Sequence, residues 1–149
     1  MRAVIQRVSR ARVSVGEDVV GEIGNGILLL LGISGRDTEA DAKHLLDKTV
    51  NLRIFDDAGG RMNESLVDQD AGLLIVSQFT LYGDTRKGRR PSYIDAASPE
   101  AANRLYEFFV SEARKIIKNV ATGRFQAMMD VELVNDGPVT LLLDTERNF

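Results

Sequence analysis

The chain has 149 residues, of which 44% are hydrophobic and 28% charged, and its formal net charge is −3 at pH 7. This composition is typical of one globular domain, not of a disordered or fibrous chain. The lack of cysteine excludes disulfides, zinc–thiolate sites and a cysteine nucleophile, and a single histidine excludes histidine-rich metal sites. The longest apolar run, Ile27 to Leu31, is shorter than the ~20 residues that span a bilayer. We therefore expect one soluble, cytoplasmic domain over residues 1–149, without a metal or other cofactor.

The first third of the chain is rich in strand-forming residues. The pattern predicts strands over Arg2–Ser9 and Arg12–Val15, and after the turn Gly16–Asp18 it predicts Val19–Ile23 as a hairpin partner. Ile27–Ile33 has no polar alternation, which favours a strand covered on both faces.

Two amphipathic helices are predicted. Cap-type residues precede a helix over about Glu39–Asn51, and Ser98-Pro99-Glu100 begins a second helix that continues to about Lys118. Four further short strands are expected, at Leu52–Phe55, Leu73–Val76, Phe125–Val134 and Val139–Leu143. Together the elements predict an α/β fold with a curled, largely antiparallel or mixed, barrel-like sheet on which the two main helices pack.

The tetrad Ser77-Gln78-Phe79-Thr80 follows an apolar strand. Strand alternation places Gln78 and Thr80 on one face, and strand ends in α/β sheets border ligand crevices. The same polar groups could instead satisfy backbone hydrogen bonds where the strand stops. The residues alone leave both interpretations open.

A second candidate is Asn135-Asp136-Gly137-Pro138, whose composition is typical of a hairpin turn. A Gly-Pro bond can also be cis, as about 5–6% of X-Pro bonds are, and would then fix the direction of two carbonyls. On spacing alone the turn is favoured.

Two further groups of residues carry charge that could serve a function. Arg86, Lys87, Arg89 and Arg90 form a cluster without an internal acid, which could hold a few phosphates or remain a solvated loop. His44 lies on the predicted polar face of its helix, so we expect it to be solvated and not catalytic.

Three motifs give the chain a resemblance to a known family. The segments Met1–Val8, Ser77–Leu81 and Asn135–Thr140 resemble those of the D-aminoacyl-tRNA deacylases, also called D-tyrosyl-tRNA deacylases. The resemblance covers essentially the whole chain and includes Thr122-Gly123-Arg124-Phe125. It implies a cytoplasmic homodimer that hydrolyses the ester between a D-amino acid and the 3′-terminal adenosine of tRNA. It also implies removal of glycine from mischarged tRNA.

The resemblance also implies roles for particular residues. Thr80, Gln78 and Phe79 are expected at the reacting ester, Ser77 and Met129 in the substrate pocket, and Gly137-Pro138 as a cis motif. This motif would reach into the partner protomer's site and screen chirality. Their charge, and not the resemblance, leads us to expect tRNA phosphate contacts from Arg86, Lys87, Arg89 and Arg90. Tyr82 and Gly83 differ from the small residues that many members carry there, which affects the expected pocket rim.

Elementary chemistry is compatible with this implied reaction. An aminoacyl ester is labile, and one oxyanion donor contributes about 3 kcal/mol, so backbone N–H groups near Phe79 and Thr80 would suffice. We therefore expect attack by water, with Thr80 as an orienting group. Carbonyls of Gly137 and Pro138 could accept the substrate ammonium and exclude an L side chain.

Two other functions remain open from the sequence. The chain could be a small-ester hydrolase with Thr80 as nucleophile, although no base is visible that would activate this hydroxyl. It could also be a non-catalytic RNA-binding module that uses the basic clusters. The expected partner is aminoacyl-tRNA; binding to DNA or to a membrane is not expected.

Overall fold

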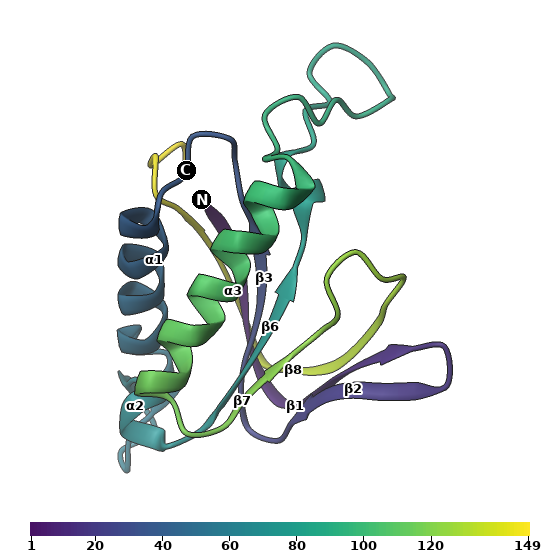
Figure 1. The fold of residues 1–149 in the computed structure, drawn as a ribbon. Coiled ribbons are helices and arrows are strands. Elements are labelled where there is room, and N and C mark those ends of the chain that lie inside the picture. Colours follow the sequence, from purple (N-terminus) through teal and green to yellow (C-terminus); the bar gives the residue numbers. More distant parts are fainter.

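The computed structural model describes residues Met1–Phe149, and a twisted sheet lies at its centre (Figure 1). The strands of this sheet are β1 (Arg2–Val15), β2 (Asp18–Ile23), β3 (Gly26–Gly32), β6 (Gly72–Ser77), β7 (Val120–Thr122) and β8 (Asp130–Asp144). β1 pairs antiparallel with β2, β3 and β8, whereas the β3–β6 and β6–β7 pairs are parallel. A separate antiparallel pair consists of β4 (Phe55–Asp56) and β5 (Met62–Glu64). The sheet is mixed, as the sequence predicted.

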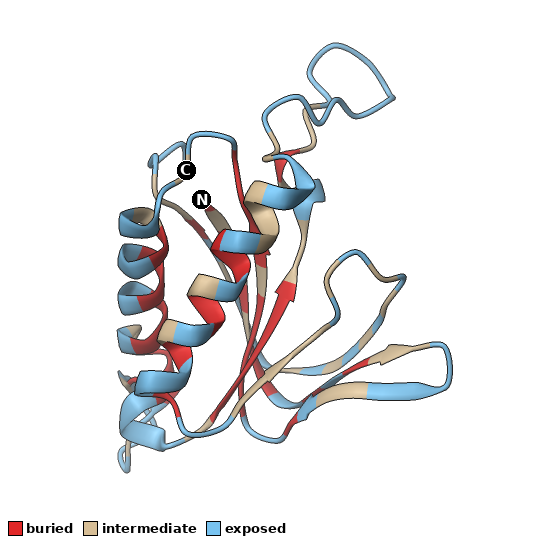
Figure 2. Ribbon diagram, viewed as in Figure 1, coloured by how far each residue is buried: buried red, intermediate tan, exposed pale blue.

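Two long helices, α1 (Glu39–Asn51) and α3 (Pro99–Ile116), lie beside each other across one face of the sheet (Figure 1). The buried sides of both helices face the sheet (Figure 2) and enclose a core of 23 buried residues, with Phe109 fully buried. A short α2 (Leu66–Gln69) and a 3₁₀-helix η1 (Phe79–Tyr82) complete the helical elements. No helix combines the length and apolar character needed to cross a bilayer.

A second, smaller core lies where the sheet curls over itself. Its seven buried residues come from β1, β3 and β6 and from Ile23 at the end of β2. Gly21 allows the edges to approach, because a Cβ at this position would lie 2.1 Å from the carbonyl oxygen of Thr122 in β7. This close approach of β2 and β7 gives the sheet its barrel-like form, which confirms the predicted fold class.

Several predicted boundaries are wrong. β1 is one continuous strand, and the expected strand at Leu52–Phe55 is reduced to Phe55–Asp56. The two strands expected at 125–134 and 139–143 are a single strand, β8, that begins at Asp130. Residues on both sides of Gly137 pair with β1 and not with each other, so Asn135–Pro138 is not a hairpin turn.

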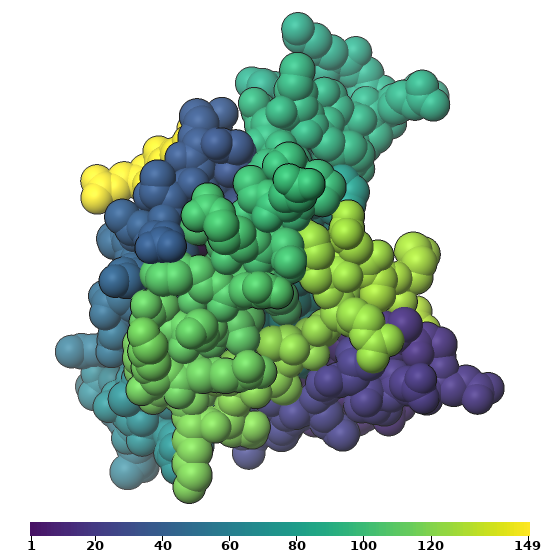
Figure 3. Space-filling view, viewed as in Figure 1, coloured from purple at the N-terminus to yellow at the C-terminus, as the bar shows by residue number.

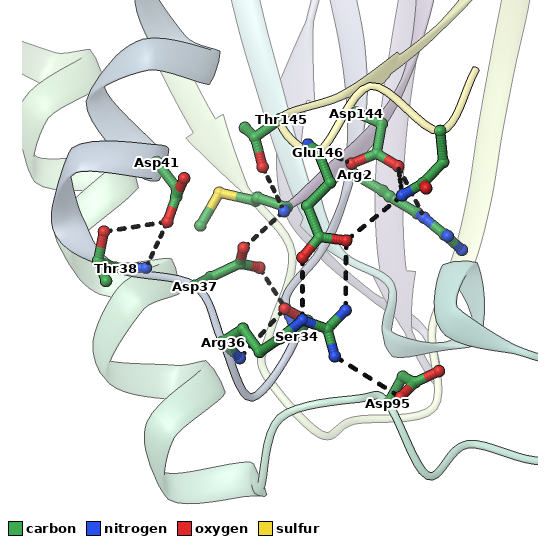
Figure 4. Close-up of polar contacts among 12 residues, drawn as sticks. Arg2, Ser34, Arg36, Asp37, Thr38, Asp41, Asp95, Asp144, Thr145 and Glu146 are labelled. Carbon is green, nitrogen blue, oxygen red and sulfur yellow. Dashed lines mark hydrogen bonds and ion pairs between the residues drawn. The ribbon is translucent and has the colours of Figure 1, made fainter.

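Polar contacts hold the two ends of the chain together (Figure 4). The ammonium group of Met1 donates to Asp37 Oδ1 at 2.6 Å and to Thr145 Oγ1 at 2.7 Å. Arg36 Nε and Nη2 donate to the two carboxylate oxygens of Glu146 at 2.9 and 3.2 Å. Arg2 Nε lies 3.4 Å from Asp144 Oδ2, whose carboxylate is fully shielded from solvent. These contacts fix β1 and β8 side by side at the end of the sheet that carries both termini.

Candidate functional site

The chain changes from strand to helix within the Ser77–Thr80 tetrad. β6 ends at Ser77, Gln78 N donates to Leu31 O at 2.7 Å, and η1 begins at Phe79. The side-chain amide of Gln78 donates to Thr80 Oγ1, so the two polar groups meet as predicted. The strand alternation behind that prediction ends at Ser77, and it is the turn into η1 that brings the two groups together.

The tetrad forms part of the wall of an apolar cavity of about 690 Å³. Ser77, Gln78 and Phe79 line it, together with Met129, while Thr80 lies beside it through its contact with Gln78. Phe79 is 57% exposed, and its ring meets that of Tyr93 edge-on, with 5.0 Å between ring centroids. A mostly apolar cavity with a few convergent polar groups is the usual form of a small-ligand site.

The segment after β7 forms the opposite wall of this cavity, through Phe125, Met129 and their neighbours. Gly123 lets the side chain of Met129 fold back against the start of this segment, because a Cβ at position 123 would lie 2.7 Å from Met129 Sδ. The N–H of Arg124 donates to the same sulfur at 3.4 Å. The structure therefore places Met129 in the same cavity as Ser77, Gln78 and Phe79.

Gly137 and Pro138 lie elsewhere, in the middle of β8. Both are exposed, the peptide bond between them is cis, and neither lines the cavity of their own chain. The φ angle of Gly137 is +117°, a backbone conformation that favours glycine. Of the residues predicted to bind the substrate ester and amino acid, Gly137 and Pro138 are the two that do not reach this cavity in their own chain.

Arg7 supports this part of β8 from the core side, a role that the sequence analysis missed. Its side chain is 9% exposed; Nη1 donates to Ile54 O at 2.7 Å and Nε donates to Asp136 O at 3.3 Å. Its guanidinium also forms ion pairs with the carboxylates of Asp136 at 3.2 Å and Asp56 at 3.7 Å. The signal was available: Arg7 continues the inward alternation of Ala3 and Ile5, where an arginine needs partners.

Asn135 braces the same segment from within β8. Its Nδ2 donates to Arg7 O at 3.0 Å and to Val139 O at 3.1 Å, bridging the residues on either side of the Gly-Pro step. Its Oδ1 accepts from Thr140 Oγ1 at 3.1 Å and from Gln6 Nε2 at 3.3 Å. The polar residues of the Asn135–Thr140 motif thus hold the backbone in place.

The predicted basic cluster lies on a loop that projects from the body of the protein (Figure 1). Arg86 Nε and Nη2 donate to the Asp84 carboxylate at 2.9 and 2.7 Å, which holds the pKa of that carboxyl well below its usual range. Lys87, Arg89 and Arg90 are exposed and form no ion pair. Three of the four predicted phosphate contacts therefore carry uncompensated charge.

Two other sequence features lie outside the cavity. Tyr82 is buried, with the Arg2 guanidinium 4.5 Å from its ring centroid, so its bulk does not form the rim. His44 is exposed on α1, as predicted.

Comparison with known proteins shows the family through a family model and through the names of the relatives. A family model described as D-Tyr-tRNA(Tyr) deacylase matches residues 4–144. Relatives named D-aminoacyl-tRNA deacylase include those of Thermosipho melanesiensis, 58% identical over 100% of both chains, and Roseiflexus sp., 61% identical over 97% of this chain and 94% of the relative. A solved structure described as c-Myc DNA Unwinding Element Binding Protein is 41% identical with a TM-score of 0.93, covering 97% of this chain and 99% of that one. The chain belongs to the D-Tyr-tRNA(Tyr) deacylase family.

Proposed function

We propose that the protein hydrolyses the ester bond of D-aminoacyl-tRNA, and of glycine mischarged onto tRNA, in the cytoplasm, releasing free tRNA and the amino acid. The main support is the hydrogen bond of Gln78 to Thr80 beside an apolar cavity, in a chain of the deacylase family. In this proposal the terminal adenosine enters the cavity between Phe79 and Phe125, and the ester lies at Thr80.

The reaction needs charge stabilisation more than a strong base. Phe79 and Thr80 are the first residues of η1, and N–H groups in a first helical turn have no partner within the helix. These N–H groups would donate hydrogen bonds to the carbonyl oxygen of the ester and so stabilise the oxyanion of the tetrahedral intermediate. Water then attacks the carbonyl carbon, the C–O bond to the ribose breaks, and the proton goes to the ribose oxygen. Thr80 Oγ1, held by Gln78, orients the water.

The choice of D over L substrates falls to the backbone at Gly137 and Pro138. Both are exposed and neither lines the cavity of its own chain, which suits a segment that acts in the site of a second copy. Their carbonyl oxygens would accept the substrate ammonium and occupy the space of an L side chain. Glycine has no side chain to exclude and passes.

An uncovered part of the sheet supports the dimer. Leu30, Val4 and Leu142 lie directly opposite one another on β3, β1 and β8, and Leu142 is 57% exposed. Thr140 and Pro138 continue the same face of β8 by alternation. A second copy on this face would cover the apolar row and meet the Gly-Pro step.

Deacylation of D- and L-tyrosyl-tRNA, with and without EDTA, tests the proposal. We expect rapid hydrolysis of the D ester only, unchanged by EDTA. Binding of tRNA without hydrolysis would instead favour an RNA-binding module. The dimer is tested by light scattering of Leu142→Glu, which should be monomeric and inactive on the D ester.

Gly137→Ala tests the chirality screen. The φ of +117° is one that residues with a side chain rarely adopt, and the Cβ would lie 2.8 Å from Arg7 Nη2 and 3.0 Å from Val139 Cγ2, so the substitution strains the backbone and displaces its neighbours. Hydrolysis of the D ester should fall at least about tenfold, the effect of losing one interaction of ~1.4 kcal/mol. Gly24→Ala, where a Cβ meets nothing within 4 Å, is the control. Equal activity of the two variants would contradict the assignment.

A further inference from the structure

A second cavity, of about 530 Å³, lies next to the first. One wall is a stripe of α3 from Asn103 to Arg114, and the other is the segment Thr122–Phe125. Figure 3 shows these two elements side by side, α3 in green and the later segment in yellow-green. Phe125 lines both cavities, so the two are adjacent and share part of a wall.

The charge of this second cavity favours an anion. Arg114 and Arg124 line it, both exposed, and neither forms an ion pair with a carboxylate. Glu107 is the only acidic residue of the lining, and Asn103 Nδ2 donates to it at 3.5 Å. The lining therefore has an excess of one positive charge, carried on guanidinium groups that can bind a phosphate in a bidentate manner.

The base of the cavity adds polar groups without adding negative charge. Tyr106 Oη donates to Ile75 O at 2.8 Å, and burial raises the pKa of this phenol to about 12, so it stays neutral. Ser111 and Thr122 bring hydroxyl groups to the two walls. Hydroxyls beside unpaired arginines are typical of contacts to a nucleic-acid backbone.

We propose that this second cavity binds backbone phosphates of the nucleotides that precede the 3′-terminal adenosine of tRNA, through Arg114 and Arg124. The inference rests on the proposed function, because it takes the terminal nucleoside to occupy the first cavity. The RNA strand then crosses the shared wall at Phe125, and its next phosphates lie between α3 and Arg124. The exposed loop with Lys87, Arg89 and Arg90 would meet more distant parts of the acceptor stem.

The test compares two substrates that share the ester but differ in phosphates: D-tyrosyl-tRNA and 3′-O-D-tyrosyl-adenosine. The variant is R114Q/R124Q. The control is R104Q. Arg104 is an exposed arginine on the same helix, but its side chain lines neither cavity. Steady-state rates are measured at NaCl concentrations from about 0.05 to 1 M, because binding through phosphate contacts weakens over this range.

The double variant should lose two phosphate contacts, which lowers the slope of log KM against log salt by about 1.4. At about 1 M salt, where phosphate contacts are screened, wild type and double variant should have the same KM for the tRNA. At about 0.1 M salt the KM of the double variant should then be about 25-fold higher than that of wild type. The kcat, and all kinetics with the adenosine ester, should match wild type, as should R104Q with either substrate.

An unchanged KM and salt slope of the double variant would overturn the inference. An equal defect with the adenosine ester would also overturn it, because the arginines would then act on the first cavity, and so would an equal defect in R104Q. If wild-type protein cleaves neither substrate, the proposed function itself fails, a result distinct from all of these.

Discussion

Arg7→Met is expected to weaken the fold by an amount that can be worked out from its contacts. The substitution leaves the carbonyl oxygen of Ile54 buried without its 2.7 Å donor, at a cost of about 1–3 kcal/mol. The ion pairs with Asp56 and Asp136 add little, about 0–1 kcal/mol, because both carboxylates are more than half exposed. The free energy of unfolding, measured in urea, should therefore fall by about 1–4 kcal/mol.

The same variant should lose selectivity, because Arg7 Nε no longer holds the carbonyl of Asp136 beside the Gly-Pro step. Loss of one hydrogen bond to a charged group, about 1.5 kcal/mol, corresponds to about a tenfold drop in the ratio of kcat/KM for D- over L-tyrosyl-tRNA.

Arg12→Met is the matched control for both measurements. Arg12 is on the same strand and also contacts β8, but its ion pair with Glu132 is exposed, so its loss should cost at most about 1 kcal/mol. Equal stability of the two variants, or full selectivity in Arg7→Met, would refute the reasoning.

Three further substitutions test individual groups. Thr80→Val should lower kcat about 10²-fold without abolishing hydrolysis, and mass spectrometry of quenched wild-type reactions should find no acyl-Thr80; a trapped adduct would make Thr80 the nucleophile. Burial alone would raise the pKa of Asp144, but hydrogen bonds from the Asn148 side chain and the Glu146 N–H, with the charge of Arg2, lower it on balance. Asp144 therefore stabilises the fold above its ordinary pKa of about 4, and this contribution disappears as the pH falls through its lower folded value, so urea unfolding of Asp144→Asn should depend less on pH below about 4. Tyr82 Oη is buried without a hydrogen-bond partner, so Tyr82→Phe should be neutral or up to about 1 kcal/mol more stable in urea; a clear loss would contradict this.

Local signals predicted the two long helices well, but not α2 or η1. The structure gives α1 the predicted bounds. The Asp41 carboxylate accepts a hydrogen bond from the N–H of Thr38 in a capping box, and Leu45 and Leu46 mark one buried face of the helix. These signals all lie within a few residues of the element that they define. The same holds for the fully apolar β3, whose burial on both faces follows from its composition.

Features that depend on distant partners could not be predicted in this way. Asn135–Pro138 has the composition of a turn, and only pairing with β1 on both sides makes it part of a strand. β7 has three residues and no distinctive pattern of its own, and its place depends on β6. For Arg7, the alternation with Ala3 and Ile5 indicated an inward side chain, but its partners, Ile54 and Asp136, depended on the fold.

The candidate site was predicted in part, and through the motifs. Ser77, Gln78, Phe79 and Met129 do line one cavity, and Gln78 does contact Thr80. The second cavity gave no signal, because Arg114 and Arg124 belong to ordinary polar positions until α3 and the segment after β7 are brought together.

In the proposed role of Gly137 and Pro138 as the chirality screen, their placement inside β8 has a consequence for how selectivity responds to heat. Loops that read a ligand often lose order well before the rest of a protein melts. Here the residues on both sides of the step are hydrogen-bonded to β1, a strand that also pairs with β2 and β3. Discrimination between mirror-image substrates should therefore persist up to the melting temperature of the whole molecule, and then vanish together with it.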